Sequence, residues 1–225
     1  MNIAIGSIFR DAAGHVDRYA AQVRSLQDAA PQHNVRVIVA EGDSVDNTWD
    51  LLCGHFGDAV FKRAHGGPKF GSVDSKQRYE QFSFCYEAVL ERVLPTDDVF
   101  IYVEGDLVWD AATMLGLLEN LELPEVDMVV PFAWYNGRHY DLWAVRGLDG
   151  GSFGMYPPHH ISMLDDSPTG LYPLSSAGSC MVMKAEIART CHFVPKELCV
   201  VGFTRDAVAH GYKIWLNPKL KVHHL

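Results

Sequence analysis

Residues 100–110 read FIYVEGDLVWD, an apolar and aromatic run that stops at Glu104, Gly105 and Asp106. A short apolar run bounded by a turn signal is typical of a buried strand. The next residues, DAATMLGLLENL (110–121), have the spacing of an amphipathic helix. The stretch therefore predicts a buried strand that ends in two carboxylates and leads into a helix.

Short apolar strands alternate with amphipathic helices on both sides of this stretch. We expect strands at 2–9, 35–41, 59–63, 98–104 and 126–134, and helices at 16–26, 43–56, 75–94 and 110–121. Strands that are separated by helices tend to pair in parallel, with the helices packed on the sheet. The pattern predicts an α/β fold, with a mostly parallel sheet and helices on both faces.

The regular alternation is lost over 135–176, which is rich in Gly, Pro, His and aromatic residues. A connection of this length is typical of a functional segment or a lid. Order returns at 179–190, with a helix near 203–211, a strand at 212–217 and a tail at 218–225. Because no internal repeat or linker is visible, we expect a single domain over 1–225.

Composition narrows the class of protein. The chain has 225 residues and a formal net charge of −9, which argues against a surface built to bind nucleic acid or anionic membrane. Its five cysteines are scattered and form no C-x-x-C pair, so we expect reduced thiols and a cytoplasmic location. The chain shows neither a leader pattern nor a long apolar run, so we expect a soluble protein without a membrane span.

Polar residues that follow the expected strands are the candidates for a site, because open α/β sheets bind ligands beyond the C-terminal ends of their strands. They are Arg10, Asp11, Glu41, Asp43, Ser44, Glu104, Gly105 and Asp106. Carboxylates that meet at one sheet edge repel one another unless a cation or a donor-rich ligand joins them. For Ser44 and Asp46, a helix cap is an equally good interpretation.

Three common nucleotide and hydrolase motifs are missing from the sequence. It has no G-x-G-x-x-G after the first strand, no G-x-x-x-x-G-K-[ST] and no G-x-S-x-G. The pattern therefore disfavours a dinucleotide oxidoreductase, a P-loop NTPase and an α/β-hydrolase.

Two of these strand ends resemble a known family. VIVAEGDSVDNTWDLL (37–52) looks like the second-strand signature of GT-A fold glycosyltransferases, where an acid-rich turn meets the base and ribose of a nucleotide-sugar. YVEGDLVWD (102–110) falls where that fold carries its Asp-x-Asp metal motif, with Glu104 in place of the first Asp. The resemblance covers nearly the whole chain. The chain resembles the family 2-like transferases and, most specifically, the fungal capsule-associated α-mannosyltransferases with their bacterial and viral relatives.

Further stretches support the narrower resemblance. RYEQFSFCYEAVL (78–90) is similar to the helix beneath the nucleotide, with Tyr86 and Glu87 where an Arg-Asn pair is usual. HYDLWAVRGLDGGSF (139–153) is similar to a Tyr-Asp-x-Trp-x-x-Arg segment on the acceptor side. GYKIWLNPKLKVHHL (211–225) resembles the closing strand and tail whose final His reaches the metal.

The resemblance implies a GT-A (Rossmann-like) fold in which 1–110 bind the nucleotide-sugar and 111–225 form the acceptor side. It implies Mn²⁺ or Mg²⁺ and a UDP- or GDP-sugar. Oxygen ligands suit these hard cations, which stabilise the leaving diphosphate as Lewis acids. The expected metal ligands are Asp106 and His224. Glu104 is expected to bind the metal through water or, instead, to hold the ribose. The expected residues around the nucleotide-sugar are Ser7, Phe9, Arg10, Glu41, Asp43, Arg78, Glu104, Gly105 and Asp106.

The acceptor half offers fewer signals. Trp143 could stack on a sugar, and Asp141 and Arg146 could bind its hydroxyls; alternatively, these two residues pair with each other in a loop pinned by Trp143. Asp106, Asp141 and Glu197 are the candidate catalytic residues. Neither Glu197 nor Asp206 fits the pattern of an inverting base, which favours transfer with retention.

Several alternatives stay open at this stage. The acceptor could be a glycan, a lipid, a protein or, in an enzyme of viral origin, a hydroxylated DNA base. DNA would require a basic channel, for which the sequence offers a local run of Arg63, Lys69, Lys76 and Arg78. A nucleotidyltransferase is disfavoured because GSIFRDAAGH (6–15) supplies only Arg10. A non-catalytic nucleotide- or sugar-binding module is the third alternative, and the sequence does not indicate the oligomeric state.

Overall fold

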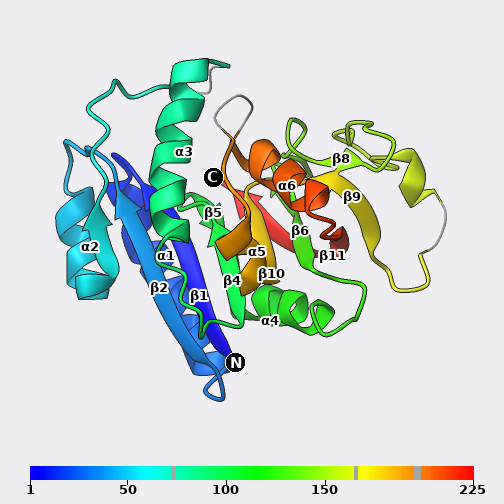
Figure 1. Cartoon of the computed structure of the whole chain (residues 1–225), viewed down its shortest axis with the longest axis horizontal. Helices are drawn as coiled ribbons and strands as arrows, with labels where there is room; N and C mark the ends of the chain where they lie inside the picture. The colour runs from blue at the N-terminus through cyan, green and yellow to red at the C-terminus, as the bar shows by residue number, and fades with distance from the viewer. Residues whose placement is uncertain (72–73, 165–166, 195–198) are drawn as a thin grey trace.

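The computed structural model describes residues 1–71, 74–164, 167–194 and 199–225. In this part of the chain eleven strands form one sheet, and its main path runs β3-β2-β1-β4-β10-β6-β11-β9-β8 (Figure 1). The strands are β1 (Asn2–Phe9), β2 (Asn34–Glu41), β3 (Val60–Lys62), β4 (Val99–Val103), β5 (Leu107–Val108), β6 (Met128–Tyr135), β7 (Arg138–His139), β8 (Arg146–Gly147), β9 (Tyr172–Ser176), β10 (Cys180–Lys184) and β11 (Ile214–His224).

Helices cover both faces of the sheet. One face packs against α1 (Ala13–Ala29), α2 (Thr48–Phe56) and α4 (Ala111–Asn120). The other packs against α3 (Lys76–Leu90), α5 (Ala185–Thr190) and α6 (Cys199–Ala209), which lie in front of the sheet in Figure 1. Two 3₁₀ turns complete the described helices, η1 (Gly57–Ala59) and η2 (Ile161–Met163).

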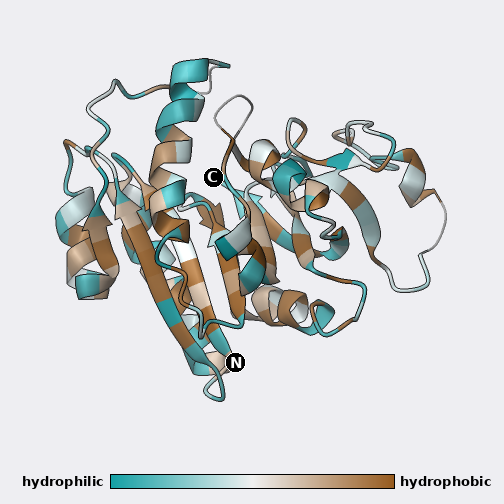
Figure 2. Cartoon of the chain, viewed as in Figure 1, coloured by the Kyte–Doolittle hydropathy of each residue, from teal (hydrophilic) through white to brown (hydrophobic). Residues whose placement is uncertain are grey.

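The alternation of side chains along each strand explains why two cores form. In β1, Ile3 and Ile5 face the core beneath α1, whereas Ala4 faces the core beneath α3. In β4, every residue is buried, and Phe100 and Ile101 point into opposite cores. A strand that is covered on both faces is largely apolar along its length, and Figure 2 shows the central strands as mostly brown, interrupted by paler stretches.

The expected α/β class is confirmed, and two features of the sheet go beyond the expected pattern. β1, β2, β3 and β4 are parallel neighbours, but β10 inserts between β4 and β6 and is antiparallel to both. The segment 218–225, expected as a tail, continues β11 past a register shift between Asn217 and Lys221. Pro218 lies at this shift, where the lack of an N–H is tolerated.

The segment 135–176, expected to be irregular, contains the short strands β7, β8 and β9. Among the described residues, no helix has the length and apolar character needed to cross a bilayer.

Asp97 ties together several elements at the N-terminal edge of the sheet. Its carboxylate accepts hydrogen bonds from the Arg36 guanidinium and, at 2.7 Å, from the Leu94 N–H. Burial opposes ionisation of Asp97, but the hydrogen bond and charge of Arg36 outweigh it and lower the pKa. A depressed pKa means that this stabilisation is present above the ordinary value and is lost as the pH falls through the lowered one.

We therefore expect Asp97→Asn to reduce the free energy of unfolding by about 2 kcal/mol at pH 7, since hydrogen bonds to a charged group are lost. The difference from the parent protein should shrink in acid, as the parent carboxylate becomes protonated. Urea denaturation at neutral and acidic pH measures both effects. Asp28→Asn, at an exposed position on α1, is the matched control, and equal stability of Asp97→Asn and the parent at pH 7 would contradict the assignment.

Candidate functional site

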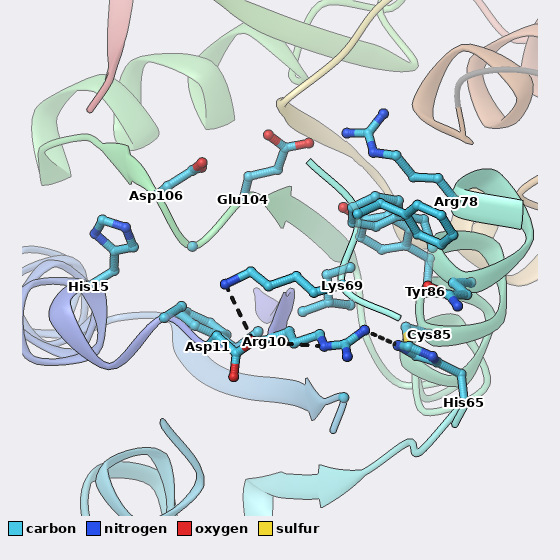
Figure 3. A pocket seen from close by; sticks show the side chains of 18 of the residues that line it. Arg10, Asp11, His15, His65, Lys69, Arg78, Cys85, Tyr86, Glu104 and Asp106 are labelled. Carbon is cyan, nitrogen blue, oxygen red and sulfur yellow. Dashed lines mark hydrogen bonds and ion pairs between the residues drawn. The ribbon is translucent and has the colours of Figure 1, made fainter. Parts of the chain in front are cut away.

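A cavity of ≈ 410 Å³ opens at the C-terminal ends of β1, β2 and β4 (Figure 3). The first residues of α1, the connection between β3 and α3, and α3 itself form its walls. The described residues that line it include Phe9, Arg10, Asp11, His15, His65, Lys69, Arg78, Tyr86, Glu104, Gly105, Asp106, Tyr140 and His224. Several expected site residues, distant in sequence, therefore share one cavity.

The turn Glu104-Gly105-Asp106 is held from two elements. The Glu104 N–H donates to the Ser179 carbonyl at 3.0 Å, which fixes the turn to β10's leading edge. Arg18, on α1, donates to the carbonyl oxygens of Gly105, at 3.0 Å, and of Leu107. The turn is thus clamped through its backbone, leaving the side chains of its two acids to the cavity.

Gly105 is required by close packing on Phe9. A Cβ atom at this position would lie 2.5 Å from the Phe9 ring, closer than any real Cβ contact. Phe9 is itself only 3% exposed, so the ring cannot swing away without disturbing the core. The missing side chain of Gly105 therefore makes room for the aromatic ring beneath it.

Asp106 and His224 lie side by side although 118 residues separate them in the sequence. The antiparallel pairing of β5 with β11 sets Leu107 opposite His224, and the His224 Nε2 atom comes 3.1 Å from Asp106 Oδ2. The Tyr140 ring stacks on the imidazole, with centroids 3.9 Å apart and planes at 21°. Strand pairing and stacking together fix the position and the plane of the His224 ring.

Asp106 and His224 each shift the pKa of the other. Burial disfavours the ionised form of Asp106, but the hydrogen bond and charge of His224 prevail and lower its pKa. Burial likewise opposes protonation of His224, and Asp106 prevails and raises its pKa. Asp106 is therefore held as a carboxylate, which is the form that binds cations.

The pair fits a divalent metal ion. The Asp106 Oδ1 atom is buried and has no hydrogen-bond partner among the described residues, so it retains a lone pair for a cation. Adjacent ligands of an octahedral ion with bonds of 2.0–2.1 Å lie about 3 Å apart, and His224 Nε2 lies 3.1 Å from the other carboxylate oxygen, Oδ2, which brings the imidazole within range of a second ligand position. A carboxylate and an imidazole suit Mn²⁺, and the carboxylate also suits Mg²⁺.

Glu104 occupies a different position in the cavity. Its carboxylate accepts a hydrogen bond of 3.3 Å from Tyr102 Oη, and in Figure 3 it lies on the side of Arg78. Within the described residues it does not join Asp106 and His224 in a set of ligand atoms that all lie within 4.8 Å. Burial, followed by the charges of Asp106 and Asp141, raises the pKa of Glu104 well above its ordinary value.

The other acids after the strands hold the connection between β3 and α3. Asp43 accepts hydrogen bonds of 2.9 Å from the N–H groups of both His65 and Gly66. Asp11 pairs with Lys69 at 3.3 Å. Since this connection forms a wall of the cavity, both carboxylates help to hold that wall, and they do not converge on the Asp106–His224 pair.

Arg10, Glu41 and Ser7 also have structural partners. Arg10 donates to the carbonyl oxygens of Gly67 and Pro68, at 3.0 and 3.1 Å, so it also supports the wall. Glu41 is 2% exposed and accepts the Ser44 N–H at 2.7 Å. Ser7 is fully buried and donates to the Val103 carbonyl at 2.7 Å. Arg10 lines the cavity, whereas the structure does not bring Ser7 to it.

Asp141 and Arg146, which the resemblance assigns to the acceptor, have separate partners. Both carboxylate oxygens of Asp141 accept from Ser179 Oγ, at 2.7 and 2.8 Å, and burial raises the pKa of Asp141. Arg146 donates to the carbonyl oxygens of Leu142 and Val145, so the alternative in which it pairs with Asp141 receives no support from the described hydrogen bonds. Trp143 is 80% exposed.

One of the two acids considered as a base, Asp206, does not line the cavity. Asp206 lies on α6, where its Oδ2 accepts the His192 N–H at 2.9 Å. The expected catalytic residue Glu197 lies outside the described residues.

Sequence reasoning missed Arg18 and His15 and gave Tyr140 no role. Arg18 carried no signal, since one cation on an amphipathic helix is normally solvated. Tyr140 stood inside a segment that we associated with the acceptor, yet its ring lies on His224. His15 lines the cavity near Asp106, and no motif marked it. These contacts depend on sheet order and could not be read from spacing.

Comparisons with known proteins show the fold. No protein-family description matches the chain, and no curated protein matches it in sequence. The mannosyltransferase PcManGT from Pyrobaculum calidifontis, solved with GDP-Man and Mn²⁺, has a TM-score of 0.63 at 14% identity; the match covers 99% of this chain and 56% of that one. The chain thus spans little more than half of that enzyme.

Two further structures share the architecture. Glucosyl-3-phosphoglycerate synthase from Mycobacterium tuberculosis, solved with Mg²⁺ and UDP, has a TM-score of 0.60 at 15% identity, covering 100% of this chain and 71% of that one. GalNAc-T7, solved with UDP, GalNAc and Mn²⁺, has a TM-score of 0.61 at 12% identity, covering 99% and 43%. The expected GT-A fold is confirmed, whereas the narrower resemblance to capsule-associated mannosyltransferases stays a prediction.

Because Arg18 clamps the turn that carries Asp106, we expect Arg18→Gln to weaken Mn²⁺ binding by roughly tenfold or more, as for other groups that orient metal ligands. Arg18→Lys should restore little, since one ammonium cannot span both carbonyls as the guanidinium fork does. Titration calorimetry with Mn²⁺ measures the effect. Arg24→Gln, at an exposed position of the same helix, is the control, and unchanged affinity in Arg18→Gln would rule out the clamp.

Proposed function

We propose that this chain is a metal-dependent glycosyltransferase that moves a sugar from a UDP- or GDP-sugar to an acceptor hydroxyl. The observation that carries the proposal is the Asp106–His224 pair, 3.1 Å apart in a cavity at the strand ends of a GT-A fold. This pair places a carboxylate and an imidazole where the cation of a nucleoside diphosphate would bind.

Asp106 and His224 would hold Mn²⁺ or Mg²⁺, which when bound stabilises the charge that develops on the leaving diphosphate. Tyr140 keeps the imidazole in plane, and Arg18 keeps the turn in place. Glu104 stands beside the pair and holds a water ligand of the ion or the ribose. These residues would hold the groups of the site in position before the donor binds, so little rearrangement is needed when the bond to the sugar breaks.

The first half of the chain, 1–110, forms the nucleotide-sugar side in this proposal. Arg78 lies in the cavity on the side of Glu104 (Figure 3), and a guanidinium suits the planar recognition of phosphate oxygens. Lys69 also lines the cavity, where it pairs with Asp11 at 3.3 Å. Together with the cation, Arg78 would offset the charge of a nucleoside diphosphate.

The second half, 111–225, forms the acceptor side. Trp143 stands 80% exposed on the segment that also carries Tyr140 and Asp141, and an exposed indole suits stacking on a sugar ring, so we propose a glycan-type acceptor. A DNA acceptor is less well supported, because Lys69 and Lys76 pair with Asp11 and Glu80 at 3.3 Å each.

For the stereochemistry we propose retention. Of the two acids considered as an inverting base, Asp206 is engaged on α6, away from the cavity. A retaining route can pass the acceptor proton to the leaving phosphate and needs no such base. Proton NMR of the fresh product gives the anomeric configuration, and an inverted anomer would overturn this part of the proposal alone.

A thermal-shift screen of UDP, GDP, CDP and their sugar conjugates, with and without Mn²⁺, tests donor binding. Ligands that bind only the native state raise the Tm, so we expect a metal-dependent rise with one nucleotide. Asp106→Asn should abolish the metal-dependent part and turnover while leaving the Tm of the free protein nearly unchanged. Asp58→Asn, at an exposed position, is the control; a metal-dependent shift that survives in Asp106→Asn would falsify the site.

His224 and His223 form a matched pair on β11. Only His224 faces Asp106, because neighbouring side chains of a strand point to opposite faces. We expect His224→Asn to weaken Mn²⁺ binding by at least about tenfold and to lower kcat, whereas His223→Asn should resemble the parent. Equal effects of the two changes would place the metal elsewhere.

Turnover distinguishes the enzyme from a non-catalytic binding module. The module would show the same metal-dependent thermal shift but neither hydrolyse nor transfer the sugar of its preferred donor over prolonged incubation.

A further inference from the structure

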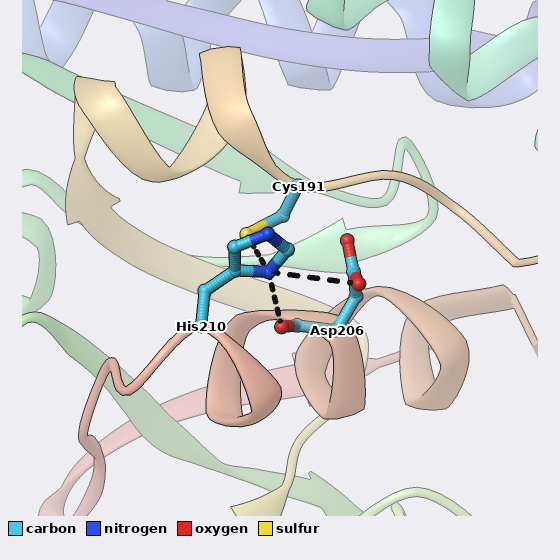
Figure 4. Close-up of side chains that lie close together, drawn as sticks. All are labelled: Cys191, Asp206 and His210. Atoms are coloured by element: carbon cyan, nitrogen blue, oxygen red, sulfur yellow. Dashed lines mark hydrogen bonds and ion pairs between the residues drawn. The ribbon is translucent and has the colours of Figure 1, made fainter.

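A second group of potential metal ligands lies apart from the cavity, where α5 ends and α6 ends. Cys191 caps the C-terminus of α5, while Asp206 and His210 come from the last turn of α6 and the residue after it (Figure 4). One ligand atom from each residue can be chosen so that all three lie within 4.8 Å of one another. None of the three lines the cavity.

The distances are close to those of a tetrahedral zinc site. Cys191 Sγ lies 4.0 Å from His210 Nδ1, which lies 3.7 Å from Asp206 Oδ1. With Zn–S near 2.3 Å and Zn–N and Zn–O near 2.0–2.1 Å, tetrahedral ligands are separated by about 3.6 Å (S to N) and about 3.4 Å (N to O). Small rotations of the His210 and Asp206 side chains would close the difference.

We propose that Cys191, Asp206 and His210 bind Zn²⁺ or a similar borderline cation, with water as the fourth ligand. A thiolate and an imidazole favour zinc over the hard ions Mg²⁺ and Mn²⁺, so this site and the Asp106–His224 site select different metals. Cys191 is 1% exposed, whereas the side chain of His210 is 46% exposed. The open side of His210 provides the entry path and room for the water.

The surroundings favour a positive charge at this point. The cluster lies at the C-terminal end of α6, a helix of eleven residues, and the C-terminus of a helix attracts cations. The His192 N–H donates to Asp206 Oδ2 at 2.9 Å. This hydrogen bond orients the carboxylate and leaves Oδ1 for the metal, as outer groups do in known sites.

Metal binding would require a change at two of the three ligands, His210 and Cys191. The His210 Nδ1 atom now lies 2.9 Å from the Asp206 carbonyl, so the ring would place its proton on Nε2 to free Nδ1 for the metal. The Cys191 thiol would release its proton to solvent, which makes binding stronger as the pH rises. The metal would fasten α6 to the end of α5, and Phe193, two residues after Cys191, stacks on Phe203 of α6 at 4.7 Å.

Cobalt titration of tag-free protein tests the proposal. In an Asp106→Asn background, which removes the other site, we expect one equivalent of Co²⁺ to produce a thiolate-to-cobalt charge-transfer band in the near ultraviolet, and Zn²⁺ to displace it. Cys191→Ser should abolish the band. Cys53→Ser, which removes a different and partly exposed thiol, should keep it.

His210→Asn guards against a folding defect, since its side chain is at the surface, and should weaken binding by at least about tenfold. The same Zn²⁺ should raise the Tm of the parent but not of Cys191→Ser or His210→Asn. Absence of the band, its survival in Cys191→Ser, or unchanged affinity in His210→Asn would show that the cluster is a helix-end ion pair beside a buried thiol. These readouts do not depend on transferase activity, so the two proposals can fail separately.

Discussion

The short antiparallel pairing of β5 with the end of β11 is the contact on which the site depends. It sets Leu107 opposite His224 and Val108 opposite His223, so backbone hydrogen bonds bring an imidazole from the last strand to the turn that carries Asp106. A slip of one residue would turn His224 to the other face of the strand. The register shift of β11 against β6, between Asn217 and Lys221, determines which histidine arrives.

Charge is distributed unevenly along this edge of the sheet. Asp11 and Asp43 accept hydrogen bonds from backbone N–H groups, and their pKa values are lowered. Protein donors therefore offset the negative charge of both carboxylates. Burial instead raises the pKa values of Glu104 and Asp141, because protein donors offset it only in part. A cation bound beside Glu104 and Asp106 would offset the repulsion between these carboxylates.

The sequence predicted the helices and strands themselves better than it predicted which strands lie next to one another in the sheet. Alternation in β1 and the unbroken apolar run of β4 identified buried strands, because side-chain period follows from backbone geometry. Nothing in the local pattern of β10 indicated that it would insert between β4 and β6 in the opposite direction. Strand partners depend on which apolar faces match across the whole domain, and the residues of one strand carry little of that information.

The same division holds for the candidate site. The sequence alone indicated the Glu104-Gly105-Asp106 turn as a site, because two carboxylates at the end of an apolar strand repel each other unless a cation or a ligand joins them. The roles of its supports arose from long-range packing: Phe9 requires the glycine, Arg18 clamps the backbone, and Tyr140 aligns His224. Which carboxylates shape a wall and which remain open to a cation depends on donors that are distant in sequence, and only the assembled sheet brings those donors within hydrogen-bonding distance.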